Sequence, residues 1–522
     1  MNRLSFLLSA FGLLPALAYA TSCSCKPSST SFGVPPSLNT SDGSIFTGAA
    51  VDAKPLSLNS SFDPDVSLMH GDSGNTGDTD YPAPLGNNLT ISSAAEQIAV
   101  VVWASDGGMI AGYGNASTSP ATRAVGAVNS STFEILASWT APVNQTLNLG
   151  YMEYILDTDD VLLSTTQGYI YVVHRENCDG VPSFTLRRTI NLTATIKPWE
   201  WMLNSMIDAA GNIWFTTGGI IGSGDPAQNS TTAGYVAPDG TVHAIHIENQ
   251  MVENGIGVSG TSMYMATGPS GAANMSSNAT GYMYAFTSDE GTGLKTVWKV
   301  PYNAGSGGKP GEMTRGTGST PVLMSDQFVA ITDNEDPQIN LLVYHQEEQE
   351  SAEAQIFCKV PLFQPGASSN ENSVISHFDG DKYGLLVQNS YAAPIFELPG
   401  PGFTLNGTWN DMSQMPGGFV RVDVDPKNGC EVRWTADLAS KTVTMLSTKT
   451  GLLYSYIQDK TPTGQYDWYA VATDWATGEI AWKIMLGSGG IFNDNWLPAS
   501  IGPDGQFYQA VFGGMVSIKD GL

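Results

Sequence analysis

The sequence predicts an all-β protein, first because of the texture of the chain from about residue 95 onward. Apolar runs of about four to eight residues follow one another there. They are separated by Asp-Gly, Asn-Gly and Thr-Gly pairs, which are typical of hairpin turns. Charged residues make up only 14% of the chain, which contains 57 glycines. This composition favours many short strands joined by tight turns over long helices.

A repeated turn is the second observation. Asp-x-x-Thr-Gly, or a close variant, precedes a strand that carries a tryptophan. The Asp side chain can cap the turn, the Gly can adopt a positive φ, and the indole then packs against the neighbouring sheet. The copies are Asp289–Gly293 with Trp298, Asp474–Gly478 with Trp482, Asp425–Gly429 with Trp434, and a worn copy that ends at Trp139.

The length of the repeating unit is the third observation. Each copy follows another strand pair, so that units of four strands start near residues 97, 150, 201, 252, 315, 371, 441 and 494. A four-stranded sheet with two apolar faces is stable only when neighbours cover both faces, and radial packing achieves this. We therefore predict a β-propeller of seven to eight four-stranded blades, closed by pairing of N- and C-terminal strands. The stretch 97–104 ("QIAVVVWA") is the expected N-terminal partner.

The sequence predicts three regions along the chain and a secreted location for the protein. Residues 1–20, with Arg3, an apolar run and the small residues Ala18–Ala20, predict a secretory signal peptide. Residues 21–94 predict an irregular arm rich in Ser, Pro and Gly, and 95–522 the propeller. No later apolar stretch predicts a membrane span. The net charge of −27 argues against nucleic acid and anionic membranes as partners.

Glycosylation motifs and cysteines agree with a secreted, extracellular protein. In an oxidising compartment Cys358 is expected to pair with Cys430, and Cys178 with Cys23 or Cys25, which leaves one of the five cysteines over. The Asn-x-Ser/Thr motifs lie at Asn39, Asn59, Asn88, Asn115, Asn129, Asn144, Asn191, Asn229, Asn274, Asn278 and Asn406.

Polar residues recur at the start of each predicted innermost strand. In a propeller these positions ring a funnel at one face, so they could hold a polar small molecule or a hard cation. Ordered water around a structural channel is the alternative interpretation. The catalytic candidates are Glu153, Glu253, Arg315 and Glu371. The ligand-binding candidates are Trp201, Asn204, Asn254, Thr317, Asn372, Lys441, Asn495 and Trp496.

The repeat "YAVATDWATGEIAWKIMLG" resembles that of the quinoprotein alcohol dehydrogenase-like propellers. That resemblance implies a propeller fold and, for the enzymes of the family, pyrroloquinoline quinone stacked on a tryptophan beside calcium. Trp201 or Trp496 would be the stacking platform, and Glu253 with Asn254 or Glu371 with Asn372 would offer oxygen ligands. The vicinal cysteine pair of those enzymes is absent from this sequence, and no catalytic Asp can be assigned.

Other motifs predict less. Asp333 and Asp336, in the turn "ITDNEDPQ", are weak candidates for a calcium ion, since Asx-turn hydrogen bonds explain such a cluster equally well. The glycine-rich segment 305–316 predicts a loop at the rim. His243 and His246 would point to opposite faces of a strand, which argues against a shared metal.

The sequence leaves three functions open. The first is binding of a small organic molecule in the axial funnel, with a non-redox acid–base step such as isomerisation, cyclisation or hydrolysis. In that case Arg315 would stabilise developing negative charge. The second is oxidation dependent on quinone and calcium. The third is a non-catalytic extracellular module that binds a polysaccharide or a protein.

Overall fold

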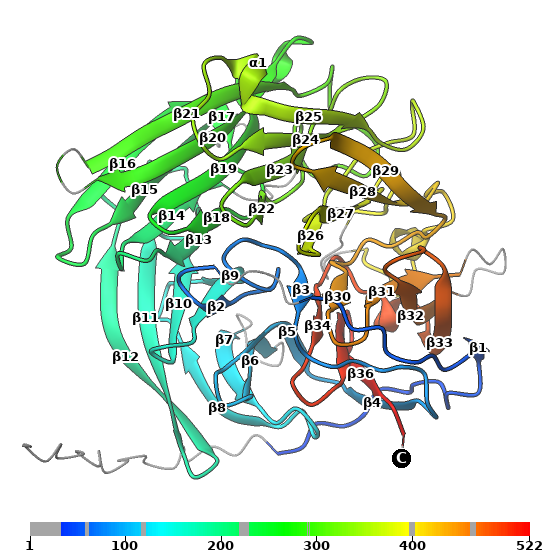
Figure 1. The fold of residues 1–522 in the computed structure, drawn as a ribbon. Helices are drawn as coiled ribbons and strands as arrows, with labels where there is room; N and C mark the ends of the chain where they lie inside the picture. The colour runs from blue at the N-terminus through cyan, green and yellow to red at the C-terminus, as the bar shows by residue number, and fades with distance from the viewer. Residues whose placement is uncertain are drawn as a thin grey trace, which may run out of the picture.

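The structure is a computed structural model that describes residues 33–57, 62–115, 122–218, 229–289, 291, 293–395, 402–459 and 466–521. In these residues, eight antiparallel blades stand radially around one axis (Figure 1). Blade 1 consists, from the innermost strand outward, of β5 (Gln97–Trp103), β6 (Met109–Asn115), β7 (Thr122–Val128) and β8 (Ile135–Thr140). Blade 2 consists of β9 (Leu147–Ile155), β10 (Asp160–Thr165), β11 (Tyr169–Cys178) and β12 (Val181–Asn191). Blade 3 consists of β13 (Met202–Ile207), β14 (Ile213–Thr217), β15 (Ser230–Val236) and β16 (Val242–Glu248).

Blades 4 to 6 continue the ring in chain order. Blade 4 consists of β17 (Gln250–Met251), β18 (Gly257–Ser259), β19 (Ser262–Pro269), β20 (Thr280–Asp289) and β21 (Gly293–Asn303). Blade 5 consists of β22 (Val322–Met324), β23 (Phe328–Thr332), β24 (Asn340–His345) and β25 (Ile356–Pro361). Blade 6 consists of β26 (Ile375–Phe378), β27 (Tyr383–Gln388), β28 (Phe419–Asp425) and β29 (Gly429–Ala436).

Blades 7 and 8 complete it, and the helices are single turns. The strands are β30 (Met445–Ser447), β31 (Leu452–Gln458), β32 (Asp467–Asp474), β33 (Ile480–Ser488); and β34 (Ala499–Ile501), β35 (Phe507–Val511), β36 (Gly514–Lys519), β4 (Thr90–Ala94). The described helices are α1 (Ala352–Gln355), η1 (Ala273–Met275), η2 (Thr408–Asn410) and η3 (Gly490–Phe492).

The core lies between the blades rather than at one centre. One apolar cluster joins blade 5 to blade 6, with Val322 and Leu341 facing Leu385 and Val422. Other clusters join blades 1 and 2, 4 and 5, and 8 and 1 in the same way. Each sheet therefore buries both faces against its neighbours, as the propeller prediction requires.

The repeated turn has the predicted structure. The Oδ1 atom of Asp474 accepts hydrogen bonds from the N–H groups of Ala476 (2.9 Å) and Thr477 (3.0 Å). Gly478 has a φ of 77°, and Trp482 is fully buried on the next strand.

Tryptophans of the other copies reach the following blade. Trp298 of blade 4 donates from Nε1 to the carbonyl of Gln346 in blade 5 (2.8 Å). Trp434 of blade 6 donates in the same way to Trp475 in blade 7 (2.9 Å). The motif therefore fastens one blade to the next.

The ring closes within blade 8, where β4 pairs antiparallel with β36, Ile91 opposite Ile518. Closure by N- and C-terminal strands is thus confirmed, but the expected stretch was wrong. Residues 97–103 form β5, the innermost strand of blade 1, and the closing strand lies just upstream at Thr90–Ala94. The two strands are separated by two residues, so the chain passes from the outer edge of blade 8 to the centre of blade 1.

The segment 62–85 crosses the middle of the ring (blue in Figure 1). Its strand β2 (Val66–Ser67) pairs with β9, and its strand β3 (Asp78–Thr79) pairs in parallel with β30. Between them, the carbonyls of Ser73, Gly74 and Thr76 accept hydrogen bonds from inner strands of blades 4, 5 and 6 (all 2.8 Å). We call this segment the axial segment. Because it bonds to the inner strands of several blades, it lies across the central channel. Farther upstream, β1 (Phe46–Gly48) pairs with the outer strand β33.

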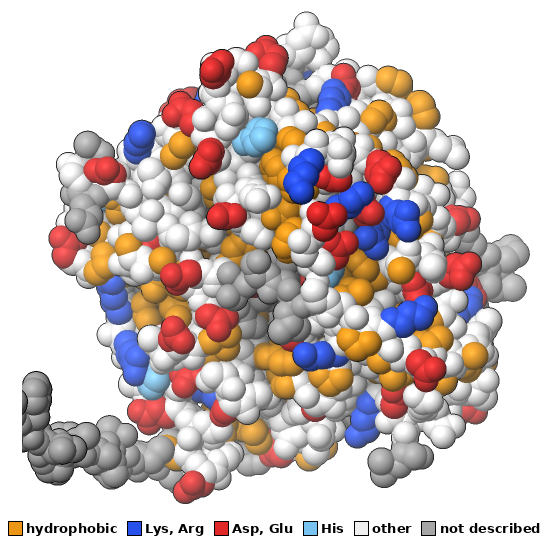
Figure 2. All heavy atoms as spheres, viewed as in Figure 1, with side chains coloured by type: hydrophobic (Ala, Val, Ile, Leu, Met, Phe, Trp, Pro, Cys, Tyr) orange, Lys and Arg blue, Asp and Glu red, His pale blue; other side chains and the backbone are white. Residues whose placement is uncertain are grey.

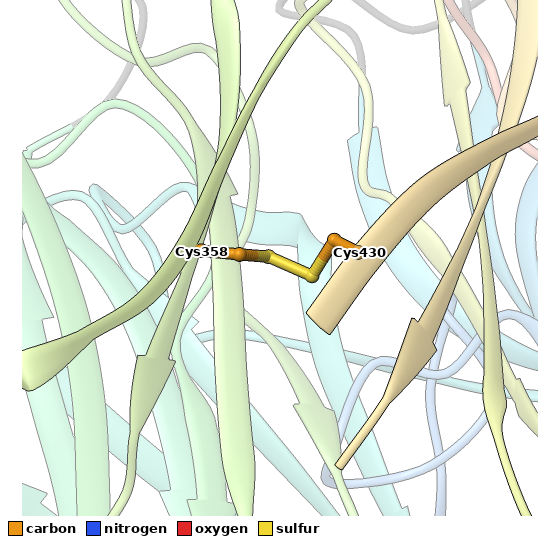
Figure 3. Close-up of a disulfide and its surroundings, with 2 residues drawn as sticks. All are labelled: Cys358 and Cys430. Carbon is orange, nitrogen blue, oxygen red and sulfur yellow. A yellow bond between two sulfur atoms is a disulfide. The ribbon is translucent and has the colours of Figure 1, made fainter. Parts of the chain in front are cut away.

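The predicted disulfide Cys358–Cys430 is present and links β25 of blade 5 to β29 of blade 6, with a Cα–Cα distance of 6.3 Å (Figure 3). None of the cysteines in the described ranges is free. Cys23 and Cys25, and the predicted signal peptide, lie outside the described residues. No helix in the described part of the chain has the length and apolar character that crossing a membrane requires.

Candidate functional site

The leading ends of the inner strands meet at the axis, because side chains bond across it from blade to blade. Tyr151 of blade 2 donates from its hydroxyl to Asn254 Oδ1 of blade 4 (2.6 Å). Asn204 of blade 3 donates from Nδ2 to the carbonyl of Asn254 (3.0 Å). Asn372 of blade 6 donates from Nδ2 to the carbonyl of Lys441 in blade 7 (3.4 Å). We call this meeting point the hub.

Two predicted carboxyl groups, Glu253 of blade 4 and Glu371 of blade 6, are neighbours at the hub, where each shifts the pKa of the other. Their residues are only 5% and 6% exposed. Glu253 Oε2 accepts a short hydrogen bond from the Thr314 hydroxyl. Both oxygens of Glu371 and Oε1 of Glu253 lack a donor among the described protein atoms. The two buried carboxyl groups therefore have few donors from the surrounding described residues.

Electrostatics separates the two acids. Burial, followed by the repulsion from Glu253, holds the pKa of Glu371 well above its usual range. Burial also raises the pKa of Glu253, but hydrogen bonds from its neighbours, including Thr314, oppose that effect. Two neighbouring carboxyl groups in a buried site cannot both be ionised at low cost, so the pair holds at least one proton when the surroundings are neutral. Glu371 is the better proton carrier, and Glu253 the better base.

A third acid, Glu312, was not predicted. Its Oε2 accepts from the Lys309 N–H (2.6 Å) and from Asn334 Nδ2 (3.2 Å). Burial raises the pKa of Glu312 to about 8, and the charge of Glu253 adds to this effect. Glu312 lies in the glycine-rich rim loop, three residues before Arg315. It is not at the start of a predicted strand, so the strand pattern did not single it out.

The hub also has a floor that the sequence did not indicate. His70 of the axial segment is buried, with Nε2 3.5 Å from the Thr320 hydroxyl. Its ring lies 6.4 Å from that of Tyr151. Burial lowers the pKa of His70 to about 4, so the ring is neutral near pH 7. The axial segment thus closes the hub from the side where the inner strands end.

Lys441 forms a second buried feature with Asp494, which precedes the predicted Asn495. The Nζ–Oδ1 distance is 3.5 Å, and the two side chains are 0% and 1% exposed. Burial lowers the pKa of Lys441 and raises that of Asp494. The ammonium group of Lys441 therefore has Asp494 as its charged partner.

Glu153 has different partners from the Glu253–Glu371 pair. Its Oε2 accepts from the Ile207 N–H of blade 3 (2.9 Å), and its Oε1 has no donor among the described atoms. Burial raises the pKa of Glu153 to about 8. Glu153 is therefore a neutral acid between blades 2 and 3 near pH 7.

Arg315 does not present its charge to the pair, contrary to the expectation that it would stabilise an anion there. The guanidinium group has five N–H donors, and all of them donate to backbone carbonyls. Nε bonds to Ala304 (3.3 Å), Nη1 to Asn274 (2.9 Å) and Ser276 (2.7 Å), and Nη2 to Ser277 (3.4 Å) and Gly305. Arg315 instead fastens the turn that contains η1 to the rim loop.

The other predicted residues take structural or surface positions. Thr317 is buried and bonds to Ser319 Oγ (2.8 Å). Asn495 and Trp496 have φ values of 46° and 65°, and Trp496 donates from Nε1 to the carbonyl of Pro394 (2.9 Å). Trp201 is 47% exposed, so its indole is not enclosed at the hub.

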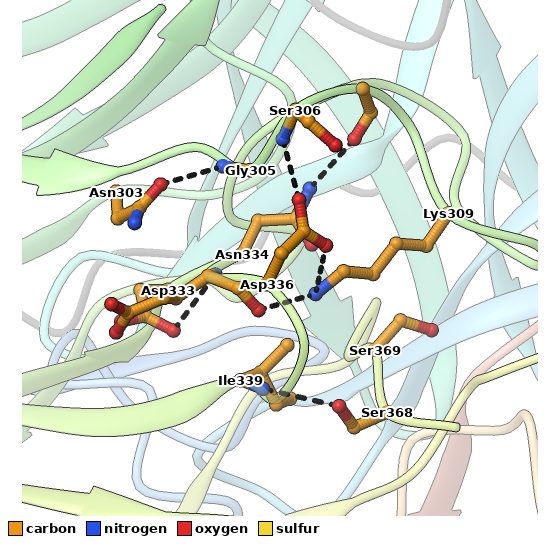
Figure 4. A network of polar contacts seen from close by, with 12 residues as sticks. Asn303, Gly305, Ser306, Lys309, Asp333, Asn334, Asp336, Ile339, Ser368 and Ser369 are labelled. Atoms are coloured by element: carbon orange, nitrogen blue, oxygen red, sulfur yellow. Dashed lines mark hydrogen bonds and ion pairs between the residues drawn. The ribbon is translucent and has the colours of Figure 1, made fainter. Parts of the chain in front are cut away.

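Asp333 and Asp336, the weak metal candidates, have protein partners (Figure 4). Asp336 Oδ2 accepts from the Ser306 N–H (2.7 Å), and its Oδ1 lies 3.9 Å from Lys309 Nζ. Asp333 accepts from the backbone (2.7 Å) and the side chain (2.9 Å) of Asn340. No group of three or more His, Cys, Asp or Glu in the described ranges could hold a metal ion. The cluster holds the rim loop in place.

The donors at the hub do not fit the quinone and calcium of the resembling enzymes. The side-chain amide of Asn254 is used by Tyr151 and by the carbonyl of Gly318. Trp201 is half exposed, the indole of Trp496 is tied to Pro394, and the sequence has no vicinal cysteines. The carboxyl pair is therefore interpreted on its own chemistry.

Among the comparisons with known proteins, one solved structure supports the fold. No protein-family model matches the chain. An uncharacterized protein of Archaeoglobus fulgidus is 24% identical over 310 residues, 56% of this chain and 58% of that protein, so the chain spans little more than half of that relative. Streptogramin B lyase has a TM-score of 0.34 and 9% identity, covering 83% of this chain and 98% of that chain. Quinohemoprotein alcohol dehydrogenase from Comamonas testosteroni has a TM-score of 0.50 and 12% identity, covering 86% of this chain and 79% of that chain. The chain therefore has the propeller fold of the quinoprotein alcohol dehydrogenases.

Proposed function

We propose that this chain is a secreted, glycosylated β-propeller that binds a small, neutral organic molecule at the hub and transfers protons to and from it. The observation that carries the proposal is the buried contact between Glu253 and Glu371. Two carboxyl groups that hold one proton supply an acid and a base at the same place.

The pair suits a proton shift on a carbonyl compound. Glu253, as carboxylate, takes a proton from carbon, while Glu371 gives its proton to the carbonyl oxygen, which yields the enol. When the substrate has a carbon–carbon double bond at the β,γ position, the product of this step is a dienol. Glu253 then returns its proton to the γ-carbon while the O–H proton of the dienol goes back to Glu371, which gives the conjugated isomer and restores the pair, so no redox partner is needed. Because Arg315 bonds only to backbone carbonyls, the proton of Glu371 is the group that stabilises the developing oxyanion.

The surroundings favour this chemistry in two ways. Low exposure of both acids keeps bulk water from levelling their pKa values. The Thr314 hydroxyl orients Glu253, and the rim loop that carries Thr314 is itself held by Asn334 and Asp336. A general base works best when its position is fixed in this manner.

Proton exchange in heavy water tests the proposal without a known substrate. The purified protein is incubated in D2O with a panel of neutral ketones, lactones and β-keto esters, and loss of the α-proton signal is followed by NMR. Glu253→Gln and Glu371→Gln are each expected to lower catalysed exchange by about 10²-fold or more. Glu348→Gln, at an exposed turn, is the matched control.

Infrared titration provides the second readout. Near neutral pH the protonated carboxyl band of the wild type contains contributions from Glu153 and Glu312 as well as Glu371, and Glu371→Gln is expected to reduce it by one carboxyl group. Equal exchange in wild type and both variants, with that band unchanged, would contradict the proposed function.

One observation favours a binding role without catalysis. Trp199 and Trp201 are 41% and 47% exposed, and exposed indoles are typical of surfaces that stack on sugar rings. Retention on an insoluble polysaccharide that is lost in Trp201→Ala, with the carboxyl pair intact, would select this alternative.

A further inference from the structure

A second axial opening lies on the far side of the axial segment, where the inner strands end. Here the axial segment and the ends of the inner strands surround a cavity of about 260 Å³. Its walls include Trp103 at the end of β5, Met445 of β30 and Ser500 of β34. The hub lies at the opposite ends of the same strands, with the bonded residues 73–76 of the axial segment in between. The cavity is therefore separate from the Glu253–Glu371 pair.

Negative charge dominates this cavity. Asp65, Asp72, Asp78 and Asp80 all line it, and its lining contains no Lys or Arg among the described residues. Asp65 and Asp80 are exposed at the mouth. Tyr81 lines the same cavity, and its pKa is raised by burial and then by the charges of Asp65 and Asp80.

The floor of the cavity is acidic as well. Asp78 Oδ2 lies 2.9 Å from His377 Nδ1, which gives Asp78 one basic partner. Asp72 accepts from the Thr76 hydroxyl (2.7 Å) and from two backbone N–H groups. Burial, and then the charge of Asp78, raises the pKa of Asp72 to about 7. A positive charge in the cavity would relieve this repulsion.

Aromatic rings supply a different kind of wall. Phe62, Tyr81 and Trp103 line the same space, and the Tyr81 and Trp103 ring centroids lie 6.4 Å apart, nearly edge to face. A hydrogen bond from Trp103 Nε1 to the Ser500 hydroxyl (3.0 Å) fixes the indole. A ring face attracts a cation that lies within about 6 Å of the ring centroid.

These features together select an organic cation over a metal ion. A metal needs several ligands converging at about 2–2.6 Å, and no such group of acids exists within the described residues. An ammonium ion with an apolar body instead needs dispersed negative charge, ring faces and a small volume. We propose that this cavity binds a small organic ammonium ion, with Asp65 and Asp80 at its charged end and Trp103 against its apolar body.

Calorimetric titration of the full glycosylated protein tests this site. The probe is 2-phenylethylammonium, and its neutral analogue 2-phenylethanol reports the contribution of charge. The cation is expected to bind at least tenfold more tightly than the alcohol. The double variant Asp65→Asn with Asp80→Asn is expected to weaken the cation about tenfold, with the alcohol unaffected.

Matched variants locate the binding. Asp381→Asn, at an exposed turn outside the cavity, should bind the cation like wild type, as should Glu253→Gln at the hub. Trp103→Leu should weaken both probes, and Asp65 and Asp80 are exposed enough for their variants to keep the wild-type melting temperature. Loss of binding in Glu253→Gln, displacement by calcium chloride at matched ionic strength, or equal affinity for cation and alcohol would each overturn the proposal.

Discussion

Replacing Glu153 with Gln is expected to change how the stability of the protein depends on pH. The pKa of this buried acid is about 8 in the folded chain and 4.5 as its ordinary value. Because the folded pKa is raised, the stabilising contribution is fully present below pH 4.5 and is lost as the pH rises through 8.

The magnitude follows from the gap between the two pKa values. At pH 7 the unfolded group is ionised and the folded group is still protonated, which corresponds to about 2.5 pH units at about 1.36 kcal/mol each. The wild type therefore loses about 3 kcal/mol of unfolding free energy between pH 4.5 and pH 7 through this one side chain. The glutamine side chain of the variant cannot ionise, yet its amide oxygen can still accept from the Ile207 N–H.

Urea unfolding at pH 4.5 and pH 7, followed by tryptophan fluorescence, measures the effect. The difference between Glu153→Gln and wild type should move by about 3 kcal/mol in favour of the variant between the two pH values. Glu348→Gln, whose side chain is exposed, should follow the wild type at both. A difference that stays constant with pH would show that Glu153 is not a buried neutral acid, and would refute the reasoning.

Three further changes test other parts of the structure. Cys358→Ser with Cys430→Ser opens a loop of 72 residues and should cost about 2–4 kcal/mol of unfolding free energy; a melting temperature equal to that of the oxidised wild type is the opposing result. Arg315→Lys keeps the charge but not the fork that bonds five carbonyls, so a loss of about 2–4 kcal/mol is expected. Equal stability would show that one ammonium group replaces the fork. Asn75→Ala removes two donors, to the carbonyls of Ile256 (2.9 Å) and Pro321 (3.0 Å). It should cost about 2–3 kcal/mol and speed proteolysis within 62–85, which Asn428→Ala at a surface turn should not do.

The propeller could be predicted because its signals are local. The capped turn at Asp474, the positive φ of Gly478 and the buried Trp482 need only adjacent residues, and the structure shows all three. The closing strand was placed a few residues too late because "TISSA" has little apolar character beside the run that follows it. The stretch 97–103 forms the innermost strand of blade 1, so the stretch before it, 90–94, is the one that pairs with the C-terminal strand.

The path of the axial segment could not be predicted for a different reason. Its bonds are made by the backbone, as when the carbonyl of Gly74 accepts from the Leu323 N–H (2.8 Å). Backbone bonds of this kind leave no periodicity of side chains, so polar composition alone favoured an irregular arm.

At the candidate site the strand pattern predicted which residues lie near the axis, but not which groups their side chains contact. Glu253 and Glu371 were proposed from the sequence because they shortly precede inner strands of the ring, and the propeller brings such positions together. Arg315 has the same kind of position, yet its long side chain reaches the carbonyls of residues 274–277. The orientation of a flexible side chain depends on acceptors that are distant in sequence, and no spacing rule contains them.

The pairing of Thr90–Ala94 with Gly514–Lys519 has a consequence for biosynthesis. The bond from Thr90 to Lys519 spans 429 positions, so blade 8 stays incomplete until the chain has been synthesised and released as far as Lys519. Until then the nascent chain would present an unpaired strand on either side of the gap, which is the kind of edge that other chains can join. Conditions that shield both edges until β36 has been synthesised should therefore raise the yield of folded protein.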